Sequence, residues 1–500
     1  MKLNELNLGT RPVDTYVGLS CSLVVLMLCW SSLTNSHSWG DDFAAYIMQA
    51  KAISEGSIEH FVERNTITVR NSFLGLGPIT YPWGYPLILT PIYKTFGLNL
   101  TALKIPNAFF LGLFVYSAFF LLRKRLSLLP RTLVVLAVAL HPVVLMVADN
   151  IISDITFLAL STLCLAYLDY LFSRREVLSI KAVTLTALIF VACQVRTVGY
   201  LLVPVVFLAQ ALEMRAKGTR FSSWTDMTKV LCVILPYLLL LIFAGLVAGF
   251  LPDKTSSYLT QIGADTVTDI IKSLIAGAYY YIEVLHDMFT PPLFTLALVP
   301  LTAIGARVSF KKDILVISYI FISFLCFALW PAREGARFLL SFLIPISYWG
   351  YLGLESLMKR LPPLSTPLIF IGLVAPGLLK SFDQALQVKP INLKGPFHES
   401  SLDMFSRLKI LTPQDAVVGF FKPRALRLMT DRLSFTITDC QQLADISYLV
   451  TNKEISERGQ LNTEQLSRCP QFQEFALAYE SPPFVIHSRR PSSPKPTQAK

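Results

Sequence analysis

Charged residues are scarce for a chain of this length. Only 15% of the 500 residues are Asp, Glu, Lys or Arg, while 53% are hydrophobic. Soluble globular proteins average about 25% charged residues. Of the 77 charged residues here, 27 lie in 381–500, so the first 380 residues are poorer still. This excludes a wholly soluble enzyme and a disordered chain, and it predicts a polytopic α-helical membrane protein with a polar C-terminal segment.

The sequence also has few cysteines and lacks the residue spacings that are typical of metal-binding sites. Six of the eight cysteines lie in apolar runs, and no CxxC or Cys/His spacing occurs, which argues against a structural zinc site and a secreted disulfide scaffold. Cys440 and Cys469 lie outside the apolar runs; two alternatives stay open, a disulfide between them or two unpaired buried thiols. The net charge of +11 comes without a basic stripe interleaved with aromatic residues, so nucleic-acid binding is excluded.

Long apolar runs dominate the remainder of the sequence. A membrane-spanning helix needs about 20 mostly apolar residues. Eleven segments qualify: 16–34, 105–122, 132–148, 155–172, 182–196, 199–213, 230–251, 291–306, 314–330, 338–356 and 366–380. The first is interpreted as a retained signal anchor rather than a cleaved signal peptide, because no small-residue cleavage site follows it.

The distribution of Lys and Arg predicts the orientation of these spans. With the N-terminus in the cytoplasm, the inside loops hold 18 basic residues and the short outside loops hold five, as the positive-inside rule requires. Merging the fifth and sixth spans across the turn near Arg196–Gly199 would move later basic loops outside, so two spans are favoured. An odd number of spans places the segment 381–500 in the periplasm or cell exterior.

Two adjacent carboxylates lie in the first outer loop, 35–104. Asp41 and Asp42 precede an apolar stripe that predicts a helix ending at Gly56. Either acid would cap that helix, or one would act as a general base at the membrane surface. Their repulsion raises one pKa and the helix N-terminus lowers it, so the net direction stays open. The aromatic, Pro-rich segment 81–86 predicts a second interfacial element.

Four more charged residues lie at the outer ends of spans. Asp154 begins the fourth span and is either a solvated loop residue or an acid directed into the protein, where acids are costly and often functional. Arg196 either extends to lipid headgroups or serves the site. Arg333 and Arg337 lie outside, against the charge rule. Phosphate is a natural partner for them because guanidinium binds it with two hydrogen bonds, and the alternative is an ion pair with Glu334.

The C-terminal segment alternates between helical and extended patterns. This alternation predicts a small extracytoplasmic α/β domain at 381–487. A disordered tail is predicted at 488–500. Helices are expected at 398–411, 423–430 and 440–445, and strands or extended segments at 416–421, 434–438, 446–451, 472–479 and 484–487.

Four short motifs occur in the order and spacing of a known family. They are Asp41-Asp42-Phe43-Ala44-Ala45-Tyr46, the Pro-rich stretch from Tyr81 to Phe96-Gly97, Ser153-Asp154, and Arg337-Phe338-Leu339-Leu340 with Pro345. In these motifs the chain resembles the C-type (GT-C fold) membrane glycosyltransferases, the superfamily of the protein O-mannosyltransferases and the bacterial lipid A aminoarabinose transferase. The resemblance covers 16–380 and implies a bundle of about eleven transmembrane helices with a small C-terminal α/β extracytoplasmic domain.

The resemblance also implies a reaction and a set of site residues. A sugar would pass from a polyprenyl phosphate donor to an acceptor hydroxyl of a protein, lipid or glycan at the outer face of the cell membrane. Asp41 would be the base, with Asp42 as the alternative because the family often has Asp-Glu at this site. Asp154 would orient the acceptor or the sugar, and Arg337, Arg333 and Arg196 would bind the donor phosphate. A divalent metal shared by Asp41 and Asp154 is compatible with some relatives, although no ligand cluster demands it.

Two other classes of protein remain as alternatives. A transporter or flippase would place charges mid-span and would use paired broken helices, whereas the polar residues here gather at one membrane face. A non-catalytic receptor or envelope assembly protein would use the polar C-terminal segment to bind a partner.

Reporter fusions test the predicted topology. Alkaline phosphatase fused after residue 385 should be active, and alkaline phosphatase fused after residue 218 should be inactive, because only the outer face supports folding of the reporter. An inactive fusion at 385 together with an active one at 218 would reverse the orientation.

Overall fold

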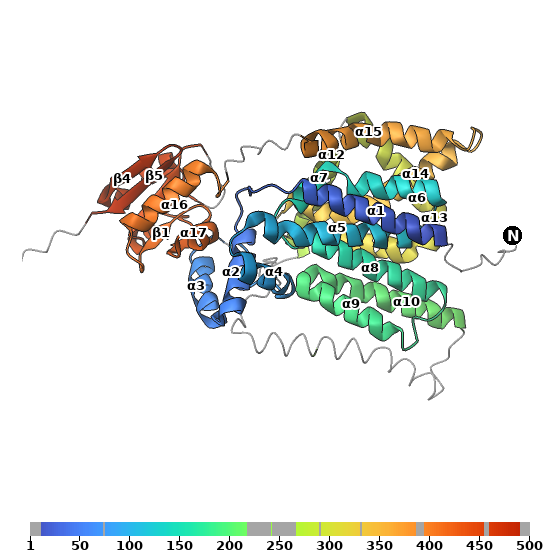
Figure 1. Ribbon diagram of the computed structural model, residues 1–500, viewed down its shortest axis with the longest axis horizontal. Helices are drawn as coiled ribbons and strands as arrows, with labels where there is room; N and C mark the ends of the chain where they lie inside the picture. The colour runs from blue at the N-terminus through green and yellow to red at the C-terminus, as the bar shows by residue number, and fades with distance from the viewer. Residues whose placement is uncertain are drawn as a thin grey trace, which may run out of the picture.

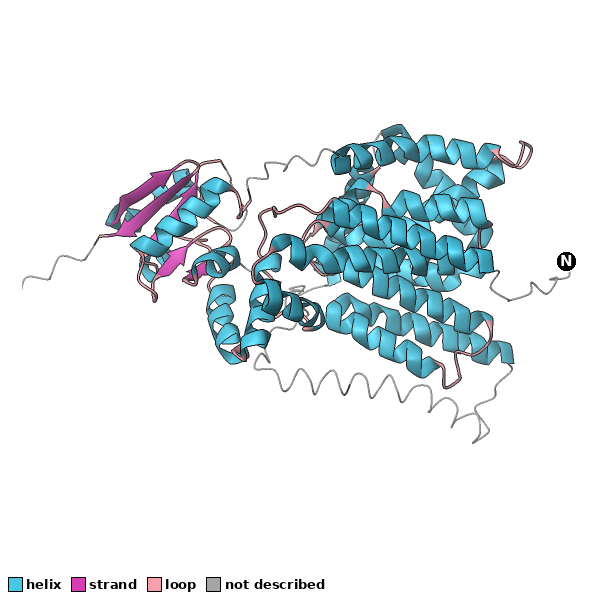
Figure 2. Ribbon diagram, in the orientation of Figure 1, coloured by secondary structure: helices cyan, strands magenta, loops and turns pink. Residues whose placement is uncertain are grey.

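The computed structural model describes residues 12–73, 76–217, 242, 267–289, 292–330, 333–386, 395–454 and 460–490. It has two parts, a bundle of long helices and a small domain that contains a sheet, with the short helices α2, α3 and α4 between them (Figure 1). Among the described residues, all strands lie in the small domain, as the colouring by secondary structure shows (Figure 2).

The bundle contains most of the apolar helices that were predicted. Six described helices are long and apolar enough to cross a membrane, or seven if the bent pair α6 and α7 counts as one span, and two shorter apolar helices add to these. The predicted span 230–251 lies outside the described residues except for residue 242, and the total of eleven stays a prediction. The bundle elements are α1 (Pro12–Ser31), α5 (Leu100–Leu122), α6 (Leu128–Ala139), α7 (Pro142–Ala148), α8 (Asp154–Ser173), α9 (Ala182–Val195), η2 (Thr197–Leu201), α10 (Leu202–Lys217), α13 (Pro292–Leu329), η4 (Gly335–Phe342), α14 (Leu343–Leu357) and α15 (Ser365–Leu386).

Two breaks interrupt the apolar helices. The predicted third span bends by 53° between α6 and α7, where Pro142 occupies the first turn of α7 and cannot continue the preceding helix. The predicted turn between the fifth and sixth spans is confirmed. Arg196 is extended, with φ −148°, and a 3₁₀ turn follows it. Gly199 lies so close to the backbone of Ala192 and Cys193 that a Cβ there would be 2.8 Å from the amide nitrogen of Cys193.

The predicted eighth and ninth spans form one helical element, α13, of 38 residues. A straight helix of that length would be about 57 Å long, nearly twice the thickness of the hydrocarbon core. Residues from both halves nevertheless lie beside the same stretch of α14, because Leu298 approaches Gly350 and Asp313 accepts a hydrogen bond from Trp349. The prediction of a non-helical loop between these two spans was wrong.

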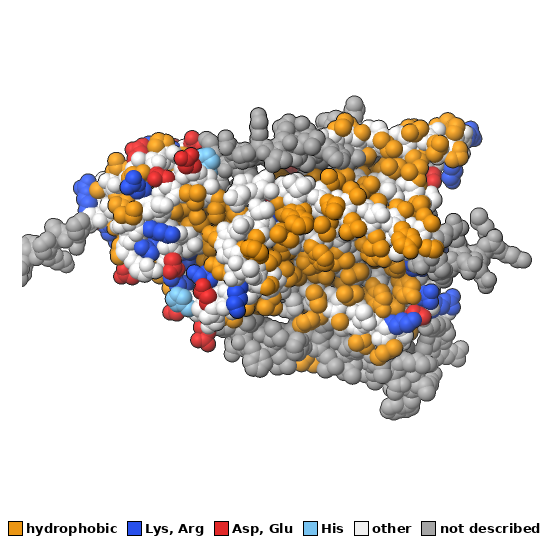
Figure 3. Space-filling model, in the orientation of Figure 1, with side chains coloured by type: hydrophobic (Ala, Val, Ile, Leu, Met, Phe, Trp, Pro, Cys, Tyr) orange, Lys and Arg blue, Asp and Glu red, His pale blue; other side chains and the backbone are white. Residues whose placement is uncertain are grey.

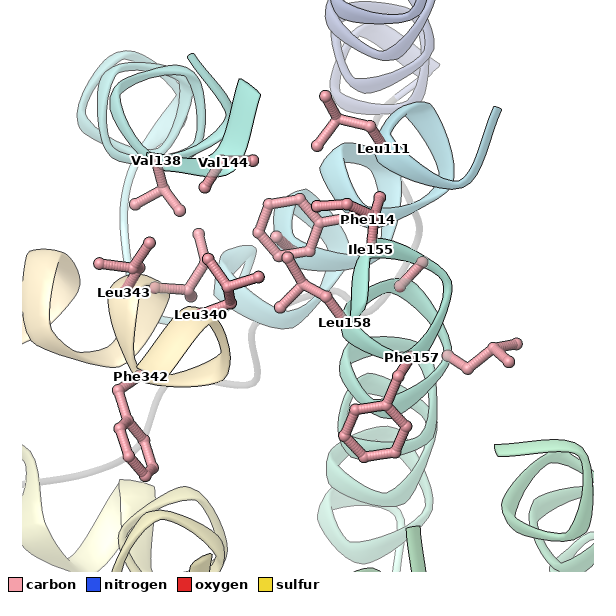
Figure 4. Close-up of a cluster of buried hydrophobic side chains, with 14 of the residues drawn as sticks. Leu111, Phe114, Val138, Val144, Ile155, Phe157, Leu158, Leu340, Phe342 and Leu343 are labelled. Atoms are coloured by element: carbon pink, nitrogen blue, oxygen red, sulfur yellow. The ribbon is translucent and has the colours of Figure 1, made fainter. Parts of the chain in front are cut away.

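A compact apolar core joins the helices near the end of the bundle that faces the small domain (Figure 1), and we call this end the outer end. Because lipid tails are as apolar as these side chains, the stabilisation inside a membrane comes from close packing rather than from removal from water. Side chains from five helices and η4 contribute to this core (Figure 4): Leu111 and Phe114, Val138, Val144, Ile155 and Leu158, Leu340 and Leu343, with Phe157 and Phe342 pointing away from the others.

A buried ion network connects the helices at the opposite end. Arg125, which follows α5, donates from Nε to Asp313 of α13 at 2.6 Å and binds Asp169 of α8 through Nη2 at 2.8 Å. Trp349 of α14 donates to the other oxygen of Asp313 at 3.0 Å. One guanidinium therefore connects three helices directly and a fourth through Asp313.

Three short helices fill the first outer loop between the bundle and the small domain. They are α2 (Asp42–Glu55), α3 (Ile58–Arg70) and α4 (Gly84–Phe96). The predicted end of the first helix is confirmed, because Gly56 adopts φ 69° after its last turn. The expected side-chain cap is absent: Asp41 makes no cap hydrogen bond to α2. More than half of α2 is buried in protein.

An unexpected helix occupies part of the predicted loop 252–290. It is α12 (Val267–Met288), which packs against the outer part of α13 and against η4. Gly277 is needed there because a Cβ would lie 1.9 Å from the carbonyl oxygen of Ala328. The sequence pattern did not reveal this helix, because its tyrosines and exposed apolar residues are interspersed with charged residues.

The predicted small α/β domain is present, and we call it the tail domain (395–490). Its five-stranded sheet has the order β2-β1-β3-β5-β4, with β1 parallel to β2 and β3, and β5 antiparallel to β3 and β4. β5 includes residues 488 and 489, which were predicted to be disordered. The elements are α16 (Glu399–Leu411), β1 (Val417–Gly419), α17 (Pro423–Thr430), β2 (Leu433–Phe435), η5 (Gln441–Asp445), β3 (Tyr448–Asn452), α18 (Thr463–Ser467), η6 (Pro470–Glu474), β4 (Phe475–Ser481) and β5 (Phe484–Arg489). Cys440 and Cys469 form a disulfide.

The tail domain docks on the outer loop, at the end of the bundle opposite the start of α1 (Figure 1). Trp39 of the outer loop packs against four tail phenylalanines with ring-centre distances of 5.0–6.4 Å, and α17 contacts α2 and α3. Hydrophobic side chains cover much of the visible surface of the bundle, whereas charged side chains gather on the tail domain and at the far end (Figure 3).

Loss of the Arg125 guanidinium should destabilise the bundle. Arg125→Gln leaves Asp169 and Asp313 without their cation, and breaking a buried pair in this way costs about 3–5 kcal/mol. We expect a clear drop in the apparent Tm of the detergent-solubilised protein. Lys181→Gln is the control, since the side chains of the Lys181–Glu176 pair are 48% and 28% exposed and ion pairs in contact with solvent contribute about 0–1 kcal/mol. An unchanged Tm for Arg125→Gln would refute this role.

Candidate active site

One arginine forms ion pairs with three carboxylates at the outer end of the bundle. Arg337 of η4 binds Asp42 from Nη1 and Nη2 at 3.1 Å, Asp154 from Nη2 at 3.0 Å and Glu334 from Nη1 at 3.0 Å. Its Nε also donates to Asp154 at 3.3 Å. The three acids come from α2, α8 and the segment before η4, so a single guanidinium brings together parts of the chain that are far apart in sequence.

The register of α2 on α8 brings the first two acids together. Tyr46 lies four residues after Asp42, and residues with that spacing share one face of a helix. The Tyr46 hydroxyl is 2.8 Å from the hydroxyl of Ser153, the residue immediately before Asp154. Docking α2 on the first turn of α8 therefore places Asp42 and Asp154 on either side of the same arginine.

The break after α9 provides a second cation. Arg196 donates to the other oxygen of Asp154 at 2.7 Å, and its guanidinium carbon lies 5.7 Å from the ring centre of Phe338. The side chain of Asp154 is only 3% exposed. Buried acids need pairing, and Asp154 has an arginine at each carboxylate oxygen. Of the two alternatives left open for Asp154, the structure therefore shows the acid directed into the protein rather than the solvated loop residue.

Asp42 is the more accessible acid of the pair with Asp154, and a tyrosine also binds it. Its side chain is 27% exposed. The hydroxyl of Tyr81 donates to Asp42 Oδ1 at 2.6 Å, while Arg337 occupies Oδ2. Burial alone would raise the pKa of Asp42, but Arg337, Tyr81 and Arg424 together lower it below its usual range. Asp42 is therefore ionised at neutral pH.

Asp41 has a different environment from its neighbour. It is buried, and its Oδ1 accepts the backbone N–H of Arg424, in the first turn of α17, at 2.9 Å. Burial raises the pKa of Asp41 to about 6, although Lys422 and Arg424 oppose this rise. The structure thus pairs Asp42, rather than Asp41, with Asp154, and it connects Asp41 to the tail domain.

A small cavity of about 20 Å³ adjoins the charged cluster, enough for about one water molecule. Asp154, Arg196 and Arg337 form its polar side. Its remaining walls are mostly apolar: Phe157, Leu158, Val198, Phe327, Phe338, Leu340 and Ser341. The cavity thus has charged groups on one side and hydrocarbon on the others.

Glu334 gives the cluster an excess of carboxylates over arginines. Burial and the neighbouring Asp42 raise the pKa of Glu334, and Arg337 opposes that rise. Its side chain is 38% exposed, against 27% for Asp42 and 3% for Asp154. Glu334 is therefore the acid that an incoming anion would displace from Arg337 at the lowest cost.

Arg333 was also predicted for this site, and a divalent metal shared by Asp41 and Asp154 was left as an open alternative. Arg333 is exposed and lies with its guanidinium carbon 5.3 Å from the ring centre of Tyr280, so it is not among the partners found for the three acids. Within the described ranges, no group of three His, Cys, Asp or Glu side chains is arranged to hold a metal ion. The carboxylate oxygens of Asp154 instead accept hydrogen bonds from Arg337 and Arg196, and Asp41 Oδ1 accepts the backbone N–H of Arg424.

Sequence reasoning named Asp41, Asp42, Asp154, Arg196 and Arg337 and considered Glu334 only as an ion-pair partner. It missed the roles of Tyr46, Tyr81 and Arg424. Tyr46 and Tyr81 stood inside the motifs that were noticed, and the spacing from Asp42 to Tyr46 was the signal available for the first. No local signal marked Arg424, which lies 383 residues after Asp41.

No protein-family model matches the chain, and no curated protein matches it in sequence. Solved structures do match its shape. ArnT from Cupriavidus metallidurans bound to undecaprenyl phosphate aligns with TM-score 0.56 and 12% identity over 97% of this chain and 100% of that one, and its apo form gives 0.55, 12%, 96% and 98%. The oligosaccharyltransferase AglB from Archaeoglobus fulgidus, in complex with an inhibitory peptide and a dolichol phosphate, aligns with TM-score 0.53 and 12% identity over 88% of this chain and 70% of that one. The chain therefore has the GT-C fold of membrane glycosyltransferases.

Proposed function

We propose that this protein transfers a sugar from a polyprenyl phosphate donor to an acceptor hydroxyl at the outer face of the cell membrane. The observation that carries the proposal is the pair Asp42 and Asp154, held by Arg337 beside a largely apolar cavity. The similar structures ArnT and AglB were solved with undecaprenyl phosphate and dolichol phosphate respectively. A lipid phosphate is the class of ligand that both the cavity and these neighbours support.

Asp42 is the general base in this proposal. The acceptor oxygen attacks the anomeric carbon, Asp42 takes the hydroxyl proton, and the bond between the anomeric carbon and the phosphate oxygen breaks. The lipid phosphate leaves with the electron pair. Asp42 suits the role because it is ionised and partly exposed. Asp41, buried against the N–H of Arg424, suits it less.

Arg337 and Arg196 stabilise the charge that develops on the leaving phosphate. Cations arranged in advance around a developing negative charge are among the strongest contributors to catalysis. Since Arg337 already binds three acids, phosphate binding requires it to release one, and the exposed Glu334 is the first candidate. Asp154, buried between both arginines, orients them and does not take up the proton. Arg333 has at most a peripheral role in phosphate binding.

Two observations support the outer location of the site. The tail domain carries the Cys440–Cys469 disulfide, and disulfides persist in oxidising compartments. The site and the tail domain also lie at the end of the bundle opposite the start of α1 (Figure 1), which places them outside if the N-terminus is cytoplasmic.

Asparagine substitutions separate the two adjacent acids. Asp42→Asn should reduce turnover by about 10²–10⁴-fold, the usual contribution of a general base, while leaving expression and donor binding largely intact. Asp41→Asn keeps an oxygen that can accept the N–H of Arg424 and should cost far less. Asp287→Asn is the control, because that outer carboxylate is 83% exposed.

The assay uses purified protein in proteoliposomes with a panel of radiolabelled polyprenyl phosphate sugars. Asp42→Asn with parental turnover and Asp41→Asn without activity would move the base to Asp41. Parental turnover in both variants would reject both acids as the base.

Substitution of Arg337 tests the phosphate site. Arg337→Lys keeps the charge but loses the planar fork that binds two oxygens at once, so it should weaken binding of a short-chain polyprenyl phosphate, and Arg337→Ala should weaken it further. Both losses should persist when the acceptor is saturating. Arg333→Lys serves as the control and should bind the lipid like the parent. Equal binding by the parent and both Arg337 variants would place the phosphate elsewhere.

A further inference from the structure

A fully buried arginine connects the tail domain to the candidate active site. Arg424 of α17 is 0% exposed. Its Nη1 donates to the carbonyl oxygen of Leu76 at 3.1 Å, and its Nη2 donates to that of Pro78. Its side chain thus fixes the outer-loop segment that leads to Tyr81, and its backbone N–H binds Asp41.

The same guanidinium reaches the tyrosine that binds Asp42. Arg424 Nη1 lies 3.3 Å from the Tyr81 hydroxyl oxygen, and its guanidinium carbon is 5.5 Å from the centre of the ring. A guanidinium group can only donate hydrogen bonds, so the Tyr81 hydroxyl oxygen accepts one from Arg424. The tyrosine proton is then directed to Asp42, 2.6 Å away.

The backbone around this contact is built for close approach. Gly77 has φ 103°, a conformation that residues with a Cβ rarely adopt. A Cβ at Gly77 would also lie 2.9 Å from the Tyr81 hydroxyl oxygen and 3.5 Å from Arg424 Nη1. Glycine at this position leaves room for the arginine–tyrosine contact.

The charge of Arg424 also acts on both acids. The acceptors bound by its guanidinium are two carbonyl oxygens and a phenol, not a carboxylate, and a buried charge without a direct counter-ion is costly. Asp41 and Asp42 provide the negative charge nearby, and Arg424 lowers the pKa of each. The tail domain therefore contributes a cation to the acid pair.

We propose that Arg424 is a positioning residue for sugar transfer: it orients the Tyr81 hydroxyl towards Asp42, so that the docked tail domain completes the active site. This inference rests on the proposed function, in which Asp42 is the base. It predicts that catalysis depends on tail docking through one specific contact rather than through general stability.

Several other ionisable groups act on Asp42 and enter any pH analysis. The groups that interact with Asp42 are His37, Asp41, Tyr46, Tyr81, Glu334, Arg337 and Arg424. Asp154 and Arg196 lie in the same cluster and act on Tyr46 and Glu334. Arg337 stays in place when Arg424 or Tyr81 is changed, so Asp42 keeps one strong partner in each variant below.

The test compares Arg424→Gln, Arg424→Lys and Tyr81→Phe by pH–rate profiles. Removing the Arg424 charge or the Tyr81 hydrogen bond removes an interaction that favours ionised Asp42, so the acidic limb of kcat should move to higher pH. We expect kcat to fall by up to about 100-fold, as for a misplaced catalytic group, with little change in donor KM. Arg424→Lys, which keeps the charge, should shift the limb less than Arg424→Gln.

Arg427→Gln is the matched control. Arg427 lies on the same helix, is also buried, and bonds Asn65 and Thr68 of α3 at 2.7 and 3.1 Å. Its loss should lower stability but leave the acidic limb unmoved. An equal limb shift in Arg427→Gln, or none in Arg424→Gln, would overturn the proposal. The double variant Tyr81→Phe/Arg424→Gln should cost clearly less than the two single losses combined, because both act on one contact; full additivity would contradict it.

An infrared titration separates this inference from the proposed function. The difference between parent and Asp42→Asn in the carboxyl band reports the titration of Asp42 without any turnover. If the protein transfers no sugar but Asp42 titrates at higher pH in Arg424→Gln than in the parent, only the proposed reaction fails. If sugar is transferred but that titration does not move, the role of Arg424 fails.

Discussion

The arrangement of the outer end depends on the guanidinium of Arg337. It binds acids from three segments that are far apart in the sequence: Asp42 after the first bundle helix, Asp154 at the start of α8, and Glu334 just before η4. Without this cation, three carboxylates would lie together in a partly buried site, where their repulsion and desolvation would be costly. The contact between Tyr46 and Ser153 and the break at Arg196 are the local features that make this convergence possible.

Charges are concentrated at both ends of the bundle, but the two clusters differ. At the end near the start of α1, Arg125 is enclosed by Asp169 and Asp313, and their side chains are at most 17% exposed. At the outer end, Asp42 and Glu334 remain partly exposed, and a cavity adjoins the arginines. The first cluster is suited to holding helices together. The second leaves groups that a substrate can reach, which is why the chemistry is proposed there.

Local signals in the sequence were sufficient for much of the fold. Gly56 ended a helix as expected, the Arg196–Gly199 turn separated two apolar runs, and Pro423–Thr430 formed a helix at the predicted position. The errors arose where tertiary contacts decide. α12 is rich in tyrosine and exposed apolar residues and resembled a loop, and α13 continues through a polar stretch that predicted a break.

The sequence predicted which residues belong to the candidate site but not which of them contact one another. Asp41 and Asp42 are neighbours on one helix end, so sequence could not say which of them faces Arg337. That choice depends on the docking of α17, whose Arg424 N–H binds Asp41. Arg424 contacts Asp41 and Tyr81 across more than 300 positions, and Tyr81 contacts Asp42 across 39 positions. Contacts between residues so far apart in the sequence leave no local pattern, and for that reason these roles emerged only from the structure.

The most direct test of the account is to locate the bound lipid. A short-chain polyprenyl phosphate with a photoreactive group next to the phosphate would be bound to the protein in proteoliposomes and irradiated, and the labelled peptides would be mapped by mass spectrometry. The account predicts labelling of cavity residues such as Phe157, Val198 and Phe338, with loss of that label under excess unlabelled lipid phosphate. Labelling confined to the opposite end of the bundle, around Arg307 and Lys311, would contradict it.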